Sequence, residues 1–436
     1  MPSRDRAAVL VMPRPSSAWP DSGALWITAA GWAAAARARF GHAWVVTPNA
    51  VATPERTLEY ASPAPHPLRR SRILRRVPTV VKTAVKDVRL FLSARRFSDV
   101  GDSGPWNSLQ LAMVWQQHDL FASAGLALAR RRNAPFVLFV HAPQVWEAGK
   151  WGTARPGWGN LLERMGERPI LVAADVVACV SEEVADELPR FGVSREKIVV
   201  TPMSVDTARF TPFVSGVEVR RRHNLDGAFV VGWTGSFRLF HGLHVAMSAF
   251  ALAHRHVPNA KLLLVGDGPQ RQVLERRAAA LGVADSVVFA GSVSHANVAS
   301  YVAAMDTAFV TACADDTFHY SPLKLREYMA CGKAVIAPRV GEMGRSLRDG
   351  VDALLYDQAD EGGLAERIIA LARAPKTRSR IGAFATQTVA NAGTWNHQLA
   401  RVCEALERLG WRVDEHGDAG LTLQTRRSGT SRIHRS

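Results

Sequence analysis

Residues 321–338, SPLKLREYMACGKAVIAP, predict a helix that runs directly into a strand. Ser321 is expected to cap the free N–H groups of this helix, and Pro322 suits its first turn, where no intrahelical donor is lost. Gly332 can take the left-handed conformation that ends a helix. The apolar residues 334–337 then predict a short buried strand. The segment therefore indicates a helix and strand of an α/β sheet.

The start of this helix and one of its carboxylates suit recognition of a nucleotide. A helix start leaves N–H groups and a partial positive charge pointing outward, where an anion such as a diphosphate can be held. Glu327 lies within two turns of that start, and its carboxylate can accept two hydroxyl hydrogen bonds, as a ribose diol would supply. The alternative is an ordinary helix with Glu327 as a solvated surface charge, since short motifs recur by chance.

Length and composition indicate a globular protein of two domains. The 436 residues are long for one core and suit two domains of about 200 residues each. Hydrophobic residues (47%) and charged residues (21%) are near the globular average. No run of about 18 apolar residues and no signal peptide is found, so we expect a cytoplasmic protein. The cysteines are far apart without a CxxC pair, which argues against zinc and disulfides: Cys179, Cys313, Cys331 and Cys403.

The net charge of +15 makes acidic partners plausible, among them anionic lipid, a phosphorylated substrate and nucleic acid. The most basic block, residues 69–96, holds eight Arg and two Lys against a single acid, Asp87. Its apolar residues fall near helical spacing: Ile73, Val77, Val80, Val81, Val85, Val88 and Leu92. We therefore hypothesise a cationic amphipathic helix that rests on an anionic membrane surface, peripherally at its inner face. The alternative is a helix packed on its own domain with a solvated basic face. No nucleic-acid partner is expected, because no recognised nucleic-acid motif appears.

The first half of the chain alternates strands and helices, as parallel sheets do. Strands are predicted at 8–12, 43–47, 111–119 and 136–141, with helices at 25–39 and 120–131. His141 ends the last of these strands. Ligands of open α/β sheets bind outside the carboxyl ends of the strands, so His141 is a candidate site residue. The alternative is a histidine that only hydrogen-bonds within its own loop.

Four segments share the order and the strand-helix alternation of one enzyme family. Beside residues 321–338 they are ADVVACVSEE (174–183), KLLLVGDGP (261–269) and SVVFAGSV (286–293). Together they resemble the retaining glycosyltransferases of the GT-B fold, family 4 type (glycosyl transferases group 1). The resemblance implies an α/β protein with two Rossmann-like domains whose parallel sheets face a central cleft.

That resemblance also implies how the chain is divided. We expect an N-terminal acceptor-side domain (1–205) and a C-terminal domain that binds the nucleotide sugar (206–390). A helix crossing back to the first domain (391–412) and a basic disordered tail (413–436) would follow.

The family further implies which residues form the donor site. They lie in the loop after the first strand, in two glycine turns, at a strand exit and at the helix start: Ser22, Gly23, Gly235, Ser236, Gly266, Asp267, Gly268, Val293, His319, Tyr320, Ser321, Pro322, Leu323 and Glu327. Lys324, Arg238 and His241 are the candidates for stabilising negative charge on the departing diphosphate. His141 matches a strand end at which the family carries a catalytic-site histidine or asparagine, on the acceptor side.

Three positions expected to contact the diphosphate or the sugar from the second domain depart from the family pattern. Ser236 and His241 stand where relatives carry an Arg and a Lys, although Arg238 lies between them and could reach across. His319 stands where many relatives carry a second glutamate, eight residues before Glu327. These changes concern the diphosphate and the sugar, whereas Glu327 is retained for the nucleotide.

The implied reaction moves a sugar from a nucleotide diphosphate sugar to a hydroxyl of an acceptor glycan, glycolipid or small molecule. The anomeric configuration would be retained, as in glycan, glycolipid or polysaccharide biosynthesis. No carboxylate placed for a covalent sugar intermediate is visible, which favours a front-face displacement assisted by the leaving group. No cofactor beyond the donor substrate is expected, and no metal, since no D-x-D element stands beside a strand end. The alternatives are a catalytically impaired GT-B protein that binds a nucleotide sugar or a partner glycosyltransferase, and an epimerase or phosphorylase of this fold.

Overall fold

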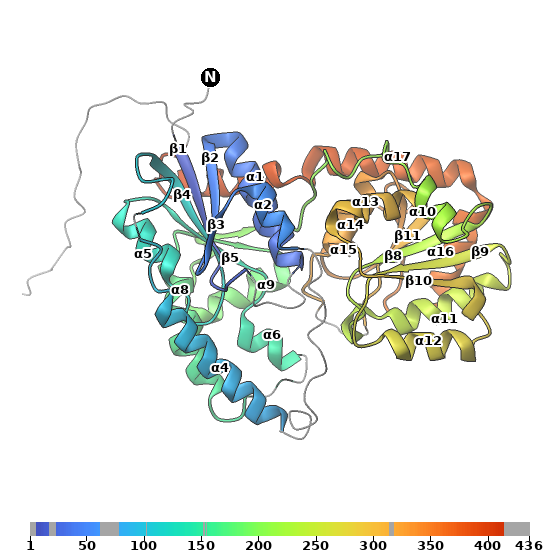
Figure 1. Cartoon of the computed structure of the whole chain (residues 1–436), viewed down its shortest axis with the longest axis horizontal. Helices are drawn as coiled ribbons and strands as arrows, with labels where there is room; N and C mark the ends of the chain where they lie inside the picture. The colour runs from blue at the N-terminus through green and yellow to red at the C-terminus, as the bar shows by residue number, and fades with distance from the viewer. Residues whose placement is uncertain are drawn as a thin grey trace, which may run out of the picture.

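The computed structural model describes residues 6–16, 23–61, 78–101, 103–150, 153, 155–313 and 318–413. These residues form two domains, each built on a central sheet flanked by helices (Figure 1). The predicted α/β class with two Rossmann-like parallel sheets is confirmed.

The sheet of the first domain has seven strands in the order β3-β2-β1-β4-β5-β6-β7. Only the edge pair β2 and β3 is antiparallel. Val9 at the centre of β1 pairs with Trp44 of β2 and Val114 of β4, and all six residues of β1 are buried. The strands are β1 (Arg6–Val11), β2 (Gly41–Thr47), β3 (Ala50–Ala52), β4 (Gln110–Gln117), β5 (Phe136–Val140), β6 (Val176–Cys179) and β7 (Ile198–Val200).

The sheet of the second domain has six parallel strands in the order β10-β9-β8-β11-β12-β13. They are β8 (Phe229–Thr234), β9 (Ala260–Val265), β10 (Val287–Gly291), β11 (Thr307–Phe309), β12 (Ala334–Pro338) and β13 (Leu354–Tyr356). Strand order reverses between β8 and β11 here, and between β1 and β4 in the first sheet. Ligand crevices of open α/β sheets form at such reversals, outside the carboxyl ends of the strands.

Helices cover both sheets. Those that follow strands of the first sheet are α1 (Gly23–Phe40), α2 (Pro54–Glu59), α4 (Thr79–Arg96), α5 (Ala124–Arg131), α6 (Gln144–Lys150), α7 (Gly159–Leu162), α8 (Arg168–Ala173) and α9 (Glu182–Glu187). The second domain contains α10 (Val217–Arg222), α11 (Leu243–His254), α12 (Arg271–Ala280), α13 (His295–Ala304), α14 (Leu323–Ala330), α15 (Gly341–Ser346), α16 (Glu361–Arg373) and α17 (Pro375–Ala392). The helix predicted at 120–131 starts only at Ala124, since Phe121 has a left-handed φ of 64° that a helix cannot contain.

The last helix, α18 (Trp395–Arg408), returns to the first domain. Its side chains Trp395, Leu399 and Val402 belong to the same buried cluster as strands β1, β4 and β5. The Trp395 ring lies 6.0 Å from the ring of Trp32 in α1. A Cβ at Gly31 would stand 2.3 Å from Trp395 Nε1, so only glycine permits this close approach.

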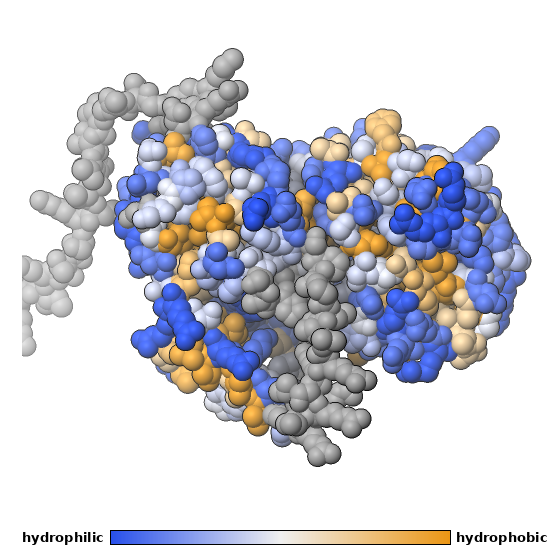
Figure 2. Space-filling view, in the orientation of Figure 1, coloured by the Kyte–Doolittle hydropathy of each residue, from blue (hydrophilic) through white to orange (hydrophobic). Residues whose placement is uncertain are grey.

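The described part of the basic block, α4, is helical as predicted, while residues 69–77 lie outside the described residues. The helix contacts its domain through Thr83, Asp87 and Ala94. Asp87 is buried and accepts hydrogen bonds from Arg155 Nε (2.8 Å) and Trp158 Nε1 (3.0 Å). The apolar side chains are instead exposed: Val80, Val81, Val85, Val88, Phe91 and Leu92. Figure 2 shows hydrophobic and hydrophilic surface side by side over this helix.

No helix in the described part of the chain is both long and apolar enough to cross a bilayer.

Candidate functional site

The start of α14 differs from its predicted geometry. The helix begins at Leu323, and Pro322 precedes it with φ −73° and ψ 120° and caps nothing with its side chain. The Ser321 hydroxyl does not cap the helix, because it accepts a hydrogen bond from the backbone N–H of Met203 (2.9 Å) in the segment that joins the domains. Leu323 packs against the buried cluster of the first domain. The helix start therefore lies where the two domains meet, with its first N–H groups free of a side-chain cap.

Lys324 is packed in an environment that disfavours its charge. Its Nζ lies 3.5 Å from the centre of the Trp233 ring, and a Cβ at Gly235 would stand 2.8 Å from that nitrogen. Burial lowers the pKa of Lys324 well below its ordinary value, and the carboxylate of Glu327 opposes the shift only in part. An anion bound beside Lys324 would act as a counter-ion and stabilise the protonated form of its amine.

Glu327 is buried rather than a solvated surface charge, which answers the alternative raised from the sequence. Its side chain is 7% exposed, and Oε1 lies 3.2 Å from Nε2 of His295, the first residue of α13. The His295 ring also packs on Phe210, with ring centres 5.5 Å apart. Val293, two residues before His295, is partly buried against the core of this domain. The predicted ribose contact is therefore a carboxylate oriented by a histidine that the sequence did not single out.

The two glycine turns of the second domain pack backbone against backbone. Gly266 and Gly268 have φ values of 133° and 158°. A Cβ at Gly266 would stand 1.8 Å from the Gly235 carbonyl oxygen, and one at Gly268 would stand 2.7 Å from Phe237 N. Phe237 N–H donates to the Asp267 carbonyl (2.9 Å), while the Asp267 carboxylate accepts from Gly268 N–H (2.7 Å). Close loop packing is thus sufficient to require these glycines, whatever ligand lies beside them.

Neither residue at the two expected cation positions, Ser236 and His241, is a cation in the free protein, whereas Arg238 between them is one. Ser236 is partly buried, and Arg238 is exposed directly before a tight turn that contains His241. Burial, reinforced by the charges of Lys324 and Arg238, lowers the pKa of His241 to about 2. The imidazole is therefore neutral at pH 7 in the free protein. His241 cannot act there as the cation that the family position suggests, although a neutral ring can still donate one N–H.

The first domain contributes His141, directly after β5. Its ring meets Phe139 edge to face at 5.0 Å, and its Nε2 is buried without a hydrogen-bond partner among the described residues. Burial lowers the pKa of His141 to about 4, and the nearby Glu147 carboxylate opposes this shift. The ring is thus neutral at pH 7. Of the loop after β1, Ser22 lies outside the described residues, and Gly23 is the first residue of α1.

A polar network at the ends of β4 and β5 was not predicted. His118 Nε2 lies 3.0 Å from Glu167 Oε1, and both side chains are buried. Glu167 also accepts the Gln144 N–H (2.5 Å) at the start of α6, and the Gln144 side chain donates to Asp119 (2.8 Å). Arg14 pairs with Asp119. His118 and Asp119 directly follow β4, so the strand-end argument used for His141 would have found them.

A polar contact connects the domains near α14, and an aromatic contact lies beside it within the second domain. His319 lies 3.4 Å from Glu147 of α6, measured from Nε2 to Oε1. The neighbouring Tyr320 ring lies 5.4 Å from the ring of Phe240, close to the His241 turn. Glu147 has no local sequence signal, because it occupies an ordinary position on a short helix.

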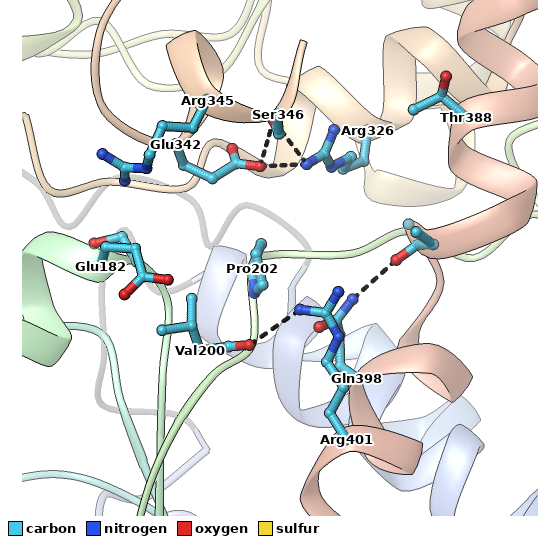
Figure 3. Close-up of a pocket in the computed structure, with 13 residues that line it drawn as sticks. Glu182, Val200, Pro202, Arg326, Glu342, Arg345, Ser346, Thr388, Gln398 and Arg401 are labelled. Atoms are coloured by element: carbon cyan, nitrogen blue, oxygen red, sulfur yellow. Dashed lines mark hydrogen bonds and ion pairs between the residues drawn. The ribbon is translucent and has the colours of Figure 1, made fainter. Parts of the chain in front are cut away.

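A separate cavity of about 320 Å³ lies at the domain junction. Arg326, Glu342 and Ser346 of the second domain line one side, and Val200, Pro202 and Arg401 line the other (Figure 3). Arg326 pairs with Glu342, and Arg401 donates to the Val200 carbonyl (3.2 Å). None of the site residues predicted from the sequence lines this cavity.

Comparison with known families gives two matches along the chain. Residues 28–209 match the family described as Glycosyltransferase Family 4, and residues 228–374 match Glycosyl transferases group 1. The D-inositol 3-phosphate glycosyltransferase of Pseudarthrobacter chlorophenolicus is 28% identical over 59% of this chain and 63% of the relative, so the chain spans less than two thirds of that protein. A GDP-mannose-dependent alpha-(1-6)-phosphatidylinositol monomannoside mannosyltransferase of Mycolicibacterium smegmatis is 28% identical over 57% of this chain and 67% of the relative.

Solved structures of similar fold cover nearly the whole chain. Anabaena Alr3699/HepE, crystallised with UDP and glucose, superimposes with a TM-score of 0.60 at 18% identity, over 92% of this chain and 99% of that chain. Sucrose-phosphate synthase from Thermosynechococcus elongatus gives a TM-score of 0.64 at 20% identity, over 93% of this chain and 99% of that chain. At sequence identities this low, the structural similarity supports a shared fold and nothing more.

Proposed function

The chain belongs to the GT-B glycosyltransferases of the family 4 type, and on this premise we propose that it transfers a sugar from a nucleotide diphosphate sugar to an acceptor hydroxyl with retention at the anomeric carbon. The observation that carries the proposal is the placement of Lys324 and Glu327 within one turn at the start of α14, beside the two glycine turns. One side chain suits a diphosphate and the other suits a ribose. The inositol phosphate acceptor in the name of one relative supports a polyol or lipid-linked polyol as acceptor.

On the donor side, the diphosphate would lie at the first turn of α14. Free N–H groups of a helix start favour an anion, and the ammonium of Lys324 lies within the same turn. Arg238 would reach the phosphates from the turn before His241, while neutral His241 would donate one N–H. These groups would stabilise the charge that builds on the diphosphate as the sugar leaves. We propose that this charge stabilisation needs no metal ion.

On the acceptor side, His141 would orient the attacking hydroxyl. A neutral imidazole with an unpartnered buried Nε2 can accept the hydroxyl hydrogen bond. A group whose pKa is about 4 is a weak base at pH 7, so it would not remove the proton before the sugar leaves. The departing diphosphate oxygen is then the group that receives the proton. This assignment agrees with a front-face displacement and with retention.

The test is direct. The purified protein would be incubated with UDP-glucose, UDP-N-acetylglucosamine or GDP-mannose and with inositol phosphate or phosphatidylinositol acceptors, and products would be analysed by NMR. We expect one donor to raise the melting temperature and to give a product with the donor's anomeric configuration. An inverted product would contradict retention. Donor binding without transfer to any acceptor would favour the catalytically impaired alternative.

We also propose that the protein attaches peripherally to anionic membrane surfaces through α4. The described helix carries Lys82, Lys86, Arg89, Arg95 and Arg96, and its acid Asp87 is buried and paired. Its valines and Leu92 are exposed to solvent. A helix with exposed apolar side chains between basic ones lies stably in the interface of an anionic bilayer. A lipid-linked acceptor would be reached from that surface.

A further inference from the structure

Glu147 places a carboxylate of the first domain against the donor loop of the second. Its Oε1 lies 3.4 Å from His319 Nε2, and its side chain is 34% exposed, whereas that of His319 is 1% exposed. The Trp146 ring packs edge to face on the His319 ring, with centres 4.9 Å apart. His319 is held from the first domain a second time, because its carbonyl accepts the Ser181 hydroxyl (2.9 Å).

Contacts at the start and at the end of helix α6 hold Glu147 in place. The start of α6 is fixed by buried Glu167, which accepts N–H groups from Gln144 and Val145 at 2.5 and 3.3 Å. Farther along the helix, the Lys150 ammonium lies 4.0 Å from the Trp146 ring centre. Glu147 is also close enough to His141 for its charge to affect the pKa of that imidazole. The carboxylate thus lies against the loop that leads into α14 and within electrostatic range of the acceptor-side histidine.

We propose that Glu147 supplies, from the N-terminal domain, the carboxylate that binds hydroxyl groups of the transferred sugar. This inference rests on the proposed function. His319 orients one carboxylate oxygen, and the partly exposed side chain leaves the other oxygen able to accept a sugar hydroxyl. His319 stands where the family resemblance leads one to expect a glutamate, and Glu147 of the first domain places a carboxylate 3.4 Å from it.

One consequence concerns how substrate recognition is divided. Lys324 and Glu327 lie on the second domain and suit the nucleotide diphosphate, whereas Glu147 lies on the first domain and suits the sugar. A complete donor therefore contacts both domains, while a nucleoside diphosphate without sugar contacts only one through these residues. The sugar would favour the arrangement in which Glu147 reaches His319.

The test compares nucleotide sugars with the corresponding nucleotides in Glu147→Gln. Calorimetry without acceptor would measure Kd for UDP-glucose and UDP, and for GDP-mannose and GDP. We expect Glu147→Gln to raise the Kd for the nucleotide sugar that the wild type binds by roughly tenfold to a hundredfold. The Kd for the corresponding nucleotide should stay unchanged. Equal affinity of variant and wild type for the nucleotide sugar, or equal losses for sugar and nucleotide, would overturn the proposal.

The matched control is Glu183→Gln. Glu183 also joins the domains, but its carboxylate is held by Arg345 in a bidentate pair at 2.7 and 2.9 Å and not by His319. We expect this variant to change both affinities by the same factor, so selective loss in Glu147→Gln reports sugar recognition rather than domain closure. The calorimetric measurement needs no turnover. If the wild type binds a nucleotide sugar but transfers nothing, that result contradicts the proposed function and leaves the proposal for Glu147 standing. Binding of none of the four ligands by the wild type contradicts both.

Discussion

Individual residues of the site have ionisation states that oppose their ordinary chemistry. Lys324 is a cation by type, yet its buried position over Trp233 lowers its pKa. His241 and His141 are titratable near neutrality by type, yet burial keeps both rings neutral at pH 7. The free site is therefore poorer in positive charge than its residue types suggest, and we expect it to gain positive charge when an anion binds.

A first prediction concerns proton uptake at Lys324. Burial lowers the pKa of Lys324 in the free protein, and a bound diphosphate would raise it, so binding should take up protons in the alkaline range, where the depressed pKa of His241 keeps that ring neutral in the free protein. Calorimetry of nucleoside diphosphate binding in buffers of different ionisation enthalpy measures this uptake. Lys324→Met should abolish it, whereas Lys261→Met, at a partly buried lysine of β9 that donates to the Asp285 carbonyl, should not. Uptake that persists in Lys324→Met would contradict the assignment.

A second prediction concerns His141. His141→Ala should lower kcat by roughly a hundredfold and leave nucleotide-sugar affinity unchanged, because the residue is assigned to orient the acceptor hydroxyl. The neutral ring is the active form, so its contribution should be constant from pH 6 to 8 and be lost as pH falls through about 4. Steady-state kinetics with a pH series checks both points. Wild-type turnover in the variant would remove His141 from the site.

At the scale of elements, helix α4 shows how one periodic pattern can serve a surface rather than a core. Its buried side chains are Thr83, Asp87 and Ala94, two of them polar, whereas its valines are exposed. A prediction from helical periodicity would normally place the apolar residues inside. The reversal is what favours an external apolar partner for this helix.

A third prediction tests α4 with vesicles. The double variant Val85→Ser/Val88→Ser should sediment less with vesicles of phosphatidylglycerol and phosphatidylcholine, while its melting temperature stays within about 2 °C of wild type, since both side chains are exposed. Binding of the wild type should also weaken as salt rises. The control Val273→Ser alters an exposed valine of α12 in the other domain. Undiminished sedimentation of the double variant would contradict membrane attachment through α4.

For the whole molecule, the return of α18 ties the end of the chain to the first sheet. Trp395 fits against Gly31 of α1, and its neighbour Thr394 accepts the His397 N–H in a capping box that starts the helix. The connection between the domains thus depends on packing between residues more than 360 positions apart, as the numbers of Gly31 and Trp395 show.

A fourth prediction tests this packing. Gly31→Ala should destabilise the protein by about 1 to 3 kcal/mol, because the added methyl group would overlap the Trp395 ring. Gly149→Ala is the control, since its Cβ would meet nothing within 4 Å. Denaturant unfolding of both variants provides the measurement. Equal stability of Gly31→Ala and wild type would show that Trp395 can move without cost.

Much of the fold and part of the site follow from local sequence. Strands such as β1, β5 and β12 are continuous apolar runs bounded by turn residues, and Gly332, with φ 70°, ends α14 as its type requires. These features depend on neighbours in the chain, so periodicity and turn chemistry reveal them. The strand-end argument found His141 for the same reason.

The remaining features were decided by tertiary structure. Ser321 was expected to cap its own helix, but the approach of Met203 from the domain connection takes its hydroxyl instead. His295 and Glu147 meet Glu327 and His319 only because distant segments pack together. The neutrality of His241 likewise depends on burial that no local pattern records. Residue type and spacing determined by themselves which groups were available, whereas the packing of distant segments determined their partners and charges, because hydrogen bonding and desolvation act through space and not along the chain.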